Sequence, residues 1–172
     1  MNPFILVLPF LLIRYIYLRI LSREAMNRAD YFPPVKGKEK IAYYISQLST
    51  IFLMIYLVFT KISLSSIYNY LGIFIYITGL IIYTKAIIDF TKPLSNGLNT
   101  NGIFHFSRNP MYVANFLNFL GCCLIINSWI YLIVLVIFQT AVHFLILSEE
   151  RWCLKNYKDK YRKYMKNVRR YI

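Results

Sequence analysis

The sequence of 172 residues is poor in acidic side chains and in cysteine. It has 7 Asp and Glu against 20 Lys and Arg, and 3 Cys. A small, odd number of cysteines excludes a disulfide-stapled scaffold. The sequence lacks a P-loop, a dinucleotide-binding glycine motif and a Ser-His-Asp spacing, so nothing supports a nucleotide motor or a hydrolase. Its 2 His are not spaced with the cysteines as metal ligands, and no metal site is expected.

Apolar residues are abundant instead. They make up 58% of the chain, whereas a soluble domain usually has about 45–50%. This composition excludes a disordered chain, and the length corresponds to one domain, residues 1–172. A net charge of +13 is also typical of nucleic-acid binders, but those are not this hydrophobic. The two features together predict an integral membrane protein with a basic face, partnered by membrane lipids and not by nucleic acid.

Five segments have the composition of membrane spans, each of which needs roughly 20 apolar residues. They cover about residues 3–21, 41–60, 68–88, 111–126 and 129–147. Arg14 and Arg19 interrupt the first segment, so Arg14 must snorkel or face the bundle. No basic residue precedes this segment and no small-residue cleavage site follows it, which favours a retained helix over a signal peptide. We therefore predict an all-α integral membrane protein with about five transmembrane helices, three of them within residues 1–88.

The distribution of basic residues predicts the orientation. Seven lie between Arg14 and Lys40, three lie around the third connection, and nine follow from Arg151 onward. The second connection has one and the fourth has none. By the positive-inside rule, the first connection, the third connection and the tail are cytoplasmic, and the N-terminus is outside. The compact chain without targeting signals suggests a bacterial inner membrane.

The last two spans and the tail have further local signals. The fourth connection is only Asn127-Ser128, which predicts a tight antiparallel hairpin. After Glu150, apolar residues recur at three- and four-residue steps and basic residues fill the other faces. We expect this amphipathic helix to lie on the inner leaflet, attracted by anionic headgroups. The apolar positions are Trp152, Tyr157, Tyr161, Tyr164, Met165 and Val168.

The third connection, about residues 89–109, is the first polar segment that could carry chemistry. Its Asn-Gly pairs and Pro93 favour turns, and loops of this length are more often functional than not. Pro110 suits the first turn of a helix, whose free N–H groups attract anions. Taken alone, Arg108 and Tyr112 have a simpler explanation in topology and interfacial anchoring. The loop ends in Ser107-Arg108-Asn109-Pro110-Met111-Tyr112.

The second polar segment is the end of the fifth span. His143 lies near its inner end, and the acidic pair Glu149-Glu150 follows directly. An acidic pair on an otherwise basic side is unusual, although solvated ion pairs with Arg151, Lys155 or Arg108 would explain it. His143 alone is more often a structural histidine than a catalyst.

Residues 89–170 resemble the isoprenylcysteine carboxyl methyltransferase and phospholipid N-methyltransferase superfamily. The resemblance implies a helical membrane enzyme that uses S-adenosylmethionine, with residues 89–172 as its core. In the family, the cofactor lies in a cytoplasmic pocket formed by the loop, the start of span four and the Glu pair. The elements that carry the resemblance are Asn101-Gly102-Ile103-Phe104, Arg108 to Tyr112, Gly121, Glu149-Glu150, Tyr161, Tyr164 and Val168. Carried over by position, the cofactor-binding candidates are Asn96, Gly97, Leu98, Asn99, Gly102, Phe104, Asn109, Pro110, Met111, Tyr112 and Glu149.

Two positions depart from the family pattern. The usual histidine is Asn109 here, which can hydrogen bond but cannot titrate near neutral pH. The arginine that holds a substrate carboxylate in the carboxyl methyltransferases is replaced by Leu145. The second departure weakens a prenylcysteine carboxylate as the acceptor and leaves a lipid amine or another amphiphile open.

The catalytic candidates are Arg108, Glu150 and His143. Glu149 suits the cationic part of the cofactor, and Arg108 or the helix N-terminus suits its carboxylate. An amine acceptor requires a base, for which Glu150 and His143 are the candidates. Two alternatives stay open: an NADPH-dependent sterol-type reductase, and a non-enzymatic adaptor with a basic lipid-binding tail. The reductase needs more basic loop residues than the chain supplies, and the adaptor would tolerate replacement of Glu149.

Overall fold

A computed structural model describes residues 2–31, 33–92 and 97–172, and within these ranges the chain is helical and has no strand. The first helical run, Pro3–Leu21, includes α1 (Val7–Leu11) and α2 (Leu18–Leu21). The remaining α-helices are α3 (Arg23–Asp30), α4 (Lys38–Tyr56), α5 (Ile67–Phe90), α6 (Pro110–Ile126) and α7 (Trp129–Asn167). The predicted all-helical membrane architecture is confirmed.

The predicted spans correspond to these helices. Pro3–Leu21, Lys38–Phe59, Ile67–Phe90 and α7 are long and apolar enough to cross a membrane. The predicted span 111–126 corresponds to α6, which is apolar but has only 17 residues. At 1.5 Å per residue this helix is about 26 Å long, slightly less than the hydrocarbon core of about 30 Å. The third connection is shorter than predicted, because α5 continues to Phe90.

The arginine inside the first span is neutralised by the chain that follows it. Ser22 caps α3, which turns back beside the first helical run. The guanidinium of Arg14 donates to the Ala29 carbonyl oxygen at 3.0 Å and to the Asp30 carboxylate at 3.1 Å. Arg14 therefore faces other protein groups, which is one of the two arrangements that the sequence allowed.

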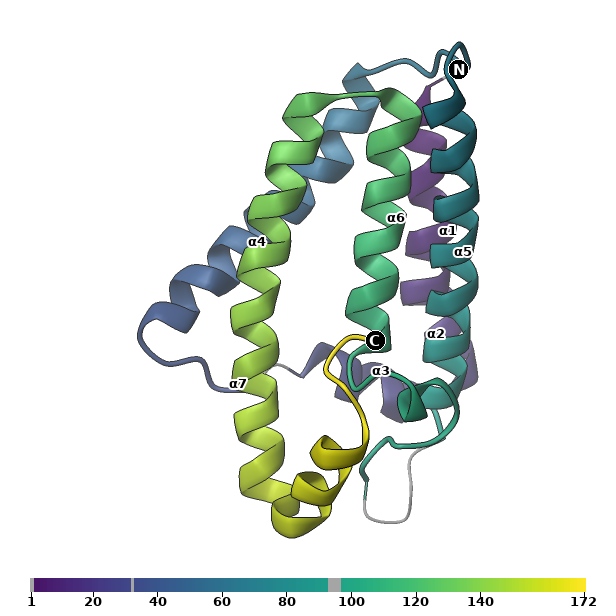
Figure 1. Cartoon of the computed structure of the whole chain (residues 1–172). Helices are drawn as coiled ribbons and strands as arrows, with labels where there is room; N and C mark the ends of the chain where they lie inside the picture. The colour runs from purple at the N-terminus through teal and green to yellow at the C-terminus, as the bar shows by residue number, and fades with distance from the viewer. Residues whose placement is uncertain (1, 32, 93–96) are drawn as a thin grey trace.

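Small residues bring α5 and α6 close together (Figure 1). A Cβ atom added to Gly121 of α6 would lie 2.6 Å from Cβ of Tyr76 and 2.8 Å from the Gly72 oxygen of α5. A Cβ atom added to Gly79 would lie 2.6 Å from Oδ1 of Asn118. Close approach through small residues is a common way for helices to associate in membranes. This packing holds the N-terminal end of α6 beside the end of α5.

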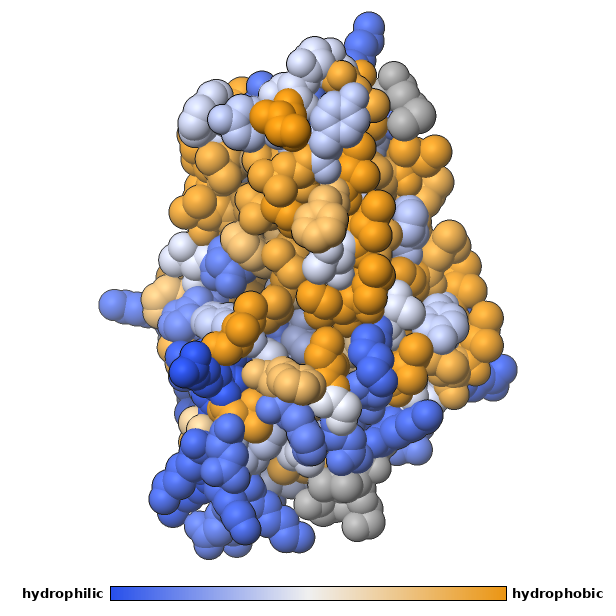
Figure 2. Space-filling model, turned by 45° about the vertical axis from the view of Figure 1, so that its right-hand side comes forward, coloured by the Kyte–Doolittle hydropathy of each residue, from blue (hydrophilic) through white to orange (hydrophobic). Residues whose placement is uncertain are grey.

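The two ends of the bundle differ in character. The described parts of the first and third connections lie with the tail at one end, and the start of the first helical run and the turn after α6 lie at the other (Figure 1). Figure 2 shows the most hydrophilic residues gathered at the first of these ends, while hydrophobic residues dominate the middle of the visible surface and some polar residues lie at the opposite end. The basic segments thus share one end, which we call the basic end.

The last helix is much longer than a membrane span. The turn before it is tight, as predicted: Asn127 has φ 49°, and Ser128 caps α7 by accepting a hydrogen bond from the Tyr131 N–H. The apolar part, residues 129–147, ends before the acidic pair. At Lys158, with φ 47°, the helix bends, so residues 159–167 turn back toward the loop (Figure 1). The predicted tail helix exists, but Tyr161 and Tyr164 are buried against Leu98 of the loop, so these two residues do not face lipid.

Candidate functional site

The start of α6 and the acidic pair of α7 meet at the basic end of the bundle. The Tyr112 hydroxyl donates a hydrogen bond to the Glu149 carboxylate at 2.5 Å. One residue further along α7, Glu150 forms an ion pair with Arg108, with Nη2 and Oε1 separated by 3.2 Å. Two polar segments that are about 40 residues apart in the sequence therefore form one site.

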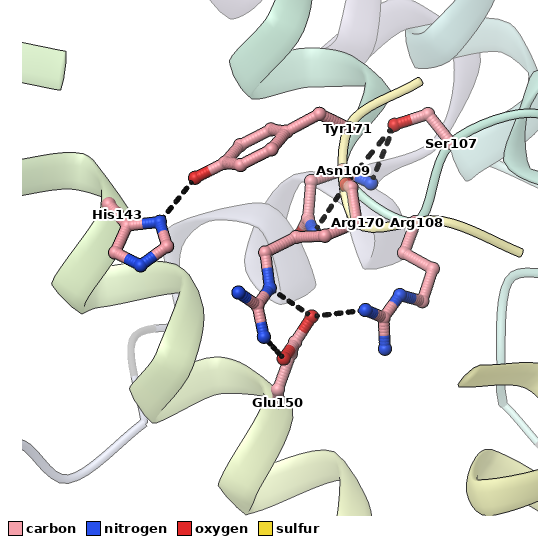
Figure 3. A network of polar contacts seen from close by, with 7 residues as sticks. All are labelled: Ser107, Arg108, Asn109, His143, Glu150, Arg170 and Tyr171. Carbon is pink, nitrogen blue, oxygen red and sulfur yellow. Dashed lines mark hydrogen bonds and ion pairs between the residues drawn. The ribbon is translucent and has the colours of Figure 1, made fainter. Parts of the chain in front are cut away.

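Glu150 lies between two arginines (Figure 3). Arg170, from beyond the end of α7, donates through Nε to Oε1 at 3.0 Å and through Nη2 to Oε2 at 2.8 Å. The side chains of Arg108 and Glu150 are 7% and 5% exposed. A carboxylate that accepts bonds from two guanidinium groups is occupied as an acceptor. Glu150 is therefore better suited to hold these arginines than to remove a proton from a substrate.

The guanidinium group of Arg108 has further hydrogen-bond donors besides the one that contacts Glu150. Its Nε and Nη1 atoms are buried and have no hydrogen-bond partner among the described residues. A buried, unpartnered guanidinium donor is costly, and an anionic group placed here would satisfy it. Arg108 can thus hold Glu150 with one nitrogen and still bind an anion with the others.

Glu149 provides the opposite charge. It follows the apolar part of α7, and burial raises its pKa to about 7, while the hydrogen bond from Tyr112 lowers it and the charge of Glu150 raises it. A cation bound next to Glu149 would favour the ionised form. Adjacent residues of one helix therefore hold an acceptor for a cation and, through Arg108, a donor for an anion.

The loop before α6 is fixed by Asp89. Its carboxylate accepts a hydrogen bond from the Ile103 N–H at 2.8 Å and an ion pair from Lys85 at 3.0 Å. Gly102 lies directly above it with φ 56°, and a Cβ atom there would lie 2.0 Å from Asp89 Oδ2. Only glycine fits this position, so the role of Gly102 is to let the loop close over α5.

A cavity of about 520 Å³ lies between this loop and the tail, a size typical of small-molecule sites. Of the candidates proposed from the sequence for cofactor binding, Leu98 lines it. Glu149 and Tyr112 are not among its lining residues, so the described cavity and the paired polar site do not coincide. The lining residues are Leu98, Thr100, His105, Lys160, Lys163, Tyr164, Asn167 and Val168.

The other candidates have different positions. Phe104 is buried, and its carbonyl oxygen accepts a hydrogen bond from the Tyr164 hydroxyl at 2.6 Å. The Gly97 carbonyl oxygen is 3.4 Å from the Tyr157 hydroxyl, and Asn99 Oδ1 is buried with no hydrogen-bond partner in the part of the chain that the structure describes. Met111 is partly buried and packs against a cluster of apolar residues that includes Tyr83 and Ala114. Asn96 lies outside the described residues.

Asn109 and Pro110 connect the loop to α6. Pro110 is buried as the first residue of the helix, where its missing N–H leaves no hydrogen bond unmade. The Asn109 side chain donates to the Arg170 carbonyl oxygen at 3.1 Å. Asn109 is thus a structural link between the start of α6 and the chain end.

Sequence reasoning missed Arg170 and Tyr171. The Tyr171 hydroxyl is 2.7 Å from Nδ1 of His143 (Figure 3). Both residues follow the last helix, where no local pattern marks them, and an arginine there is indistinguishable from the other basic residues of the tail. Among the described residues, no group of three or more His, Cys, Asp or Glu could hold a metal ion.

Comparison with known protein families matches residues 48–160 to the family described as phospholipid methyltransferase. The match covers more than half of the chain and includes α5, α6 and the Glu149-Glu150 pair. No curated protein and no solved structure matches the chain. The membrane helices, the arrangement of Arg108, Tyr112 and the acidic pair, and this match lead to one conclusion: the chain belongs to the phospholipid methyltransferase family.

Proposed function

We propose that the protein transfers a methyl group from S-adenosylmethionine to a lipidic or otherwise amphiphilic acceptor at the cytoplasmic membrane face. The observation that carries the proposal is the pairing of Tyr112 with Glu149 and of Arg108 with Glu150 at the basic end. These contacts place a carboxylate and a guanidinium with spare donors on adjacent sites. The family match supports methyl transfer as the chemistry.

The residues at the site fit the charges of S-adenosylmethionine. Its cationic part suits Glu149, and its carboxylate suits the unpartnered Nε and Nη1 of Arg108. When bound, the cofactor supplies a methyl group on a positively charged sulfur, which needs no metal for transfer. The task of the protein is alignment, because the reacting atoms must come within roughly 3–3.5 Å of each other.

An amine acceptor would also need a base, because only an unprotonated nitrogen has a lone pair for attack. Of the two candidate bases, Glu150 is already bound by two guanidinium groups. His143 instead forms a hydrogen bond with an uncharged tyrosine, Tyr171. We therefore assign the base to His143. A carboxylate or phosphate-like oxygen acceptor would need no base.

The orientation is also part of the proposal. The first and third connections and the tail share the basic end (Figure 1), and by the positive-inside rule this end is cytoplasmic. An acceptor dissolved in the membrane would then enter sideways between the helices and meet the cofactor at the inner boundary. A bacterial inner membrane is the host that we propose.

The first test is binding of S-adenosylhomocysteine to the detergent-solubilised protein by calorimetry. We expect Glu149→Gln to weaken binding about 10- to 100-fold, the usual contribution of one hydrogen bond to a charged group. Asp159→Asn, which removes an exposed carboxylate paired with Arg162 on the same helix, is the matched control and should bind as the wild type does. Equal binding by both variants would contradict the proposed role of Glu149. Binding of NADPH in place of S-adenosylhomocysteine would favour the reductase, and binding of neither ligand would favour the adaptor.

A second prediction concerns pH. Burial raises the pKa of Glu149 to about 7, so below that pH the free protein carries a proton on this carboxyl group. The positively charged amino group of S-adenosylhomocysteine must displace that proton when it binds. Affinity for S-adenosylhomocysteine should therefore fall as pH decreases below 7, by about tenfold per pH unit. The measurement is the dissociation constant from pH 5.5 to pH 8.5, about 1.5 units to either side of that pKa. A Glu149→Gln variant should lose this dependence, and a wild type without it would contradict the assignment.

A further inference from the structure

The residues after α7 fold back over the site as a strap, residues 168–171. The backbone N–H of Arg108 donates to the Arg169 carbonyl oxygen at 3.0 Å, and the side-chain amide of Asn109 donates to the Arg170 carbonyl oxygen at 3.1 Å. The Arg170 side chain binds both oxygens of Glu150. The strap is thus tied to the start of α6 by its backbone and to α7 by a side chain.

These anchors bring Tyr171 to His143. Its hydroxyl is 2.7 Å from Nδ1, and the two ring centroids are 6.2 Å apart. Tyr171 also packs against a cluster of buried apolar residues that includes Phe138, Val142 and Ile146. The strap therefore contacts all three residues that the sequence marked as catalytic candidates: Arg108 through its backbone N–H, and Glu150 and His143 through their side chains (Figure 3). The strap lies outside the residues matched to the family, 48–160.

The contact constrains the chemistry of His143. A neutral imidazole has one N–H and one lone pair, and the partner of one nitrogen decides which atom remains free. With Nδ1 engaged by Tyr171, Nε2 is the atom left for a substrate. Tyr171 is only partly buried, so its own O–H can donate to water while its oxygen accepts.

We propose that Tyr171 is a positioning residue: its oxygen accepts the Nδ1–H of His143, which leaves Nε2 unprotonated to receive the proton of an amine acceptor. The inference rests on the proposed function. In the balanced reaction, Nε2 takes one proton from the ammonium group of the acceptor, and the freed nitrogen lone pair forms the bond to the methyl carbon. The carbon–sulfur bond breaks, and its electron pair stays on sulfur. The imidazolium then returns its proton to water.

The direct test reads the tautomer of His143 without any substrate. The protein, labelled with ¹⁵N-histidine, is studied by NMR at about pH 8.5, where an imidazole is ordinarily neutral. A His105→Gln variant assigns the signals, because His105 is the other histidine in the chain. We expect His143 to carry its proton on Nδ1 in the wild type and to become a mixture of tautomers in Tyr171→Phe. A proton on Nε2 in the wild type, or a signal unchanged in Tyr171→Phe, would overturn the proposal.

The kinetic test uses dodecylamine in mixed micelles as the acceptor probe. Tyr171→Phe keeps the packing and removes the hydroxyl, so we expect kcat to fall about tenfold, part of the effect of a general base, with KM unchanged. Tyr70→Phe, an exposed tyrosine on α5, is the matched control and should turn over at the wild-type rate. Unchanged kcat in Tyr171→Phe would overturn the proposal. If the wild type binds S-adenosylhomocysteine but methylates no amine, the catalytic use of the pair is overturned while the cofactor site stands.

Discussion

Replacing Glu150 by leucine is expected to destabilise the protein by about 3–5 kcal/mol, the usual result of removing one partner of a buried ion pair. The substitution leaves the buried Arg108 without its counter-charge, while Nε and Nη1 of Arg108 already lack partners among the described residues. It also releases Arg170, and with it the strap. Thermal unfolding in detergent, followed by tryptophan fluorescence, should show a Tm lower by about 10 °C for a chain of this size.

Two further variants test the cause. The double variant Arg108→Leu with Glu150→Leu removes both charges, so it should recover part of the lost stability, because an apolar pair avoids the unpaired guanidinium. Asp159→Asn breaks the exposed pair with Arg162 and should leave Tm unchanged. If Glu150→Leu melts at the wild-type temperature, Glu150 does not neutralise Arg108 in a buried site.

The second large effect is expected at the contact between α5 and α6. In Gly121→Val, the first added carbon would lie 2.6 Å from Tyr76 Cβ and 2.7 Å from the Tyr76 backbone nitrogen. Because backbone cannot rotate away as a side chain can, the two helices must move apart, at a cost of about 3 kcal/mol or more. The start of α6 would move with the helix, so Arg108 and Tyr112 would lose alignment with the acidic pair. We expect a lower Tm and weaker binding of S-adenosylhomocysteine in the same variant.

The control for this experiment is Ile81→Val on the outward face of α5, where the side chain is exposed. It should change neither Tm nor binding, because it touches lipid and not α6. Gly121→Ala should be intermediate between valine and the wild type, because it adds the clashing Cβ without the branches. A Gly121→Val protein with wild-type Tm would show that α5 and α6 do not depend on this close approach.

Much of the fold could be predicted because membrane insertion is a local property of the sequence. Each apolar run of span length became a helix, and the short connection Asn127-Ser128 became a tight turn. The alternation of basic-rich and basic-poor connections predicted which segments share an end (Figure 1). Helix boundaries were less accurate: α5 extends to Phe90, because Asp89 pairs with Lys85 and the loop and so stays within the last turn.

The candidate site could be predicted in part. Arg108, Tyr112 and the Glu149-Glu150 pair were selected from their positions in the sequence, and they do come together. Their partners were not predictable, since either glutamate could pair with any of several nearby cations. The structure pairs Glu149 with tyrosine and gives Glu150 two arginines, so neighbouring carboxylates of one helix have different tasks.

The sequence by itself determined that this chain is a helical membrane protein with one basic end, because hydrophobicity, turn formation and charge distribution act over a few residues at a time. Tertiary structure alone decided that the bend at Lys158 returns the chain to the start of α6, and that Arg170 and Tyr171 reach Glu150 and His143. Those contacts join residues 20 and 28 positions apart. These contacts depend on the direction of the bend at Lys158, which no periodic pattern encodes. In addition, a basic residue that forms a buried ion pair looks the same in the local sequence as one that remains in water.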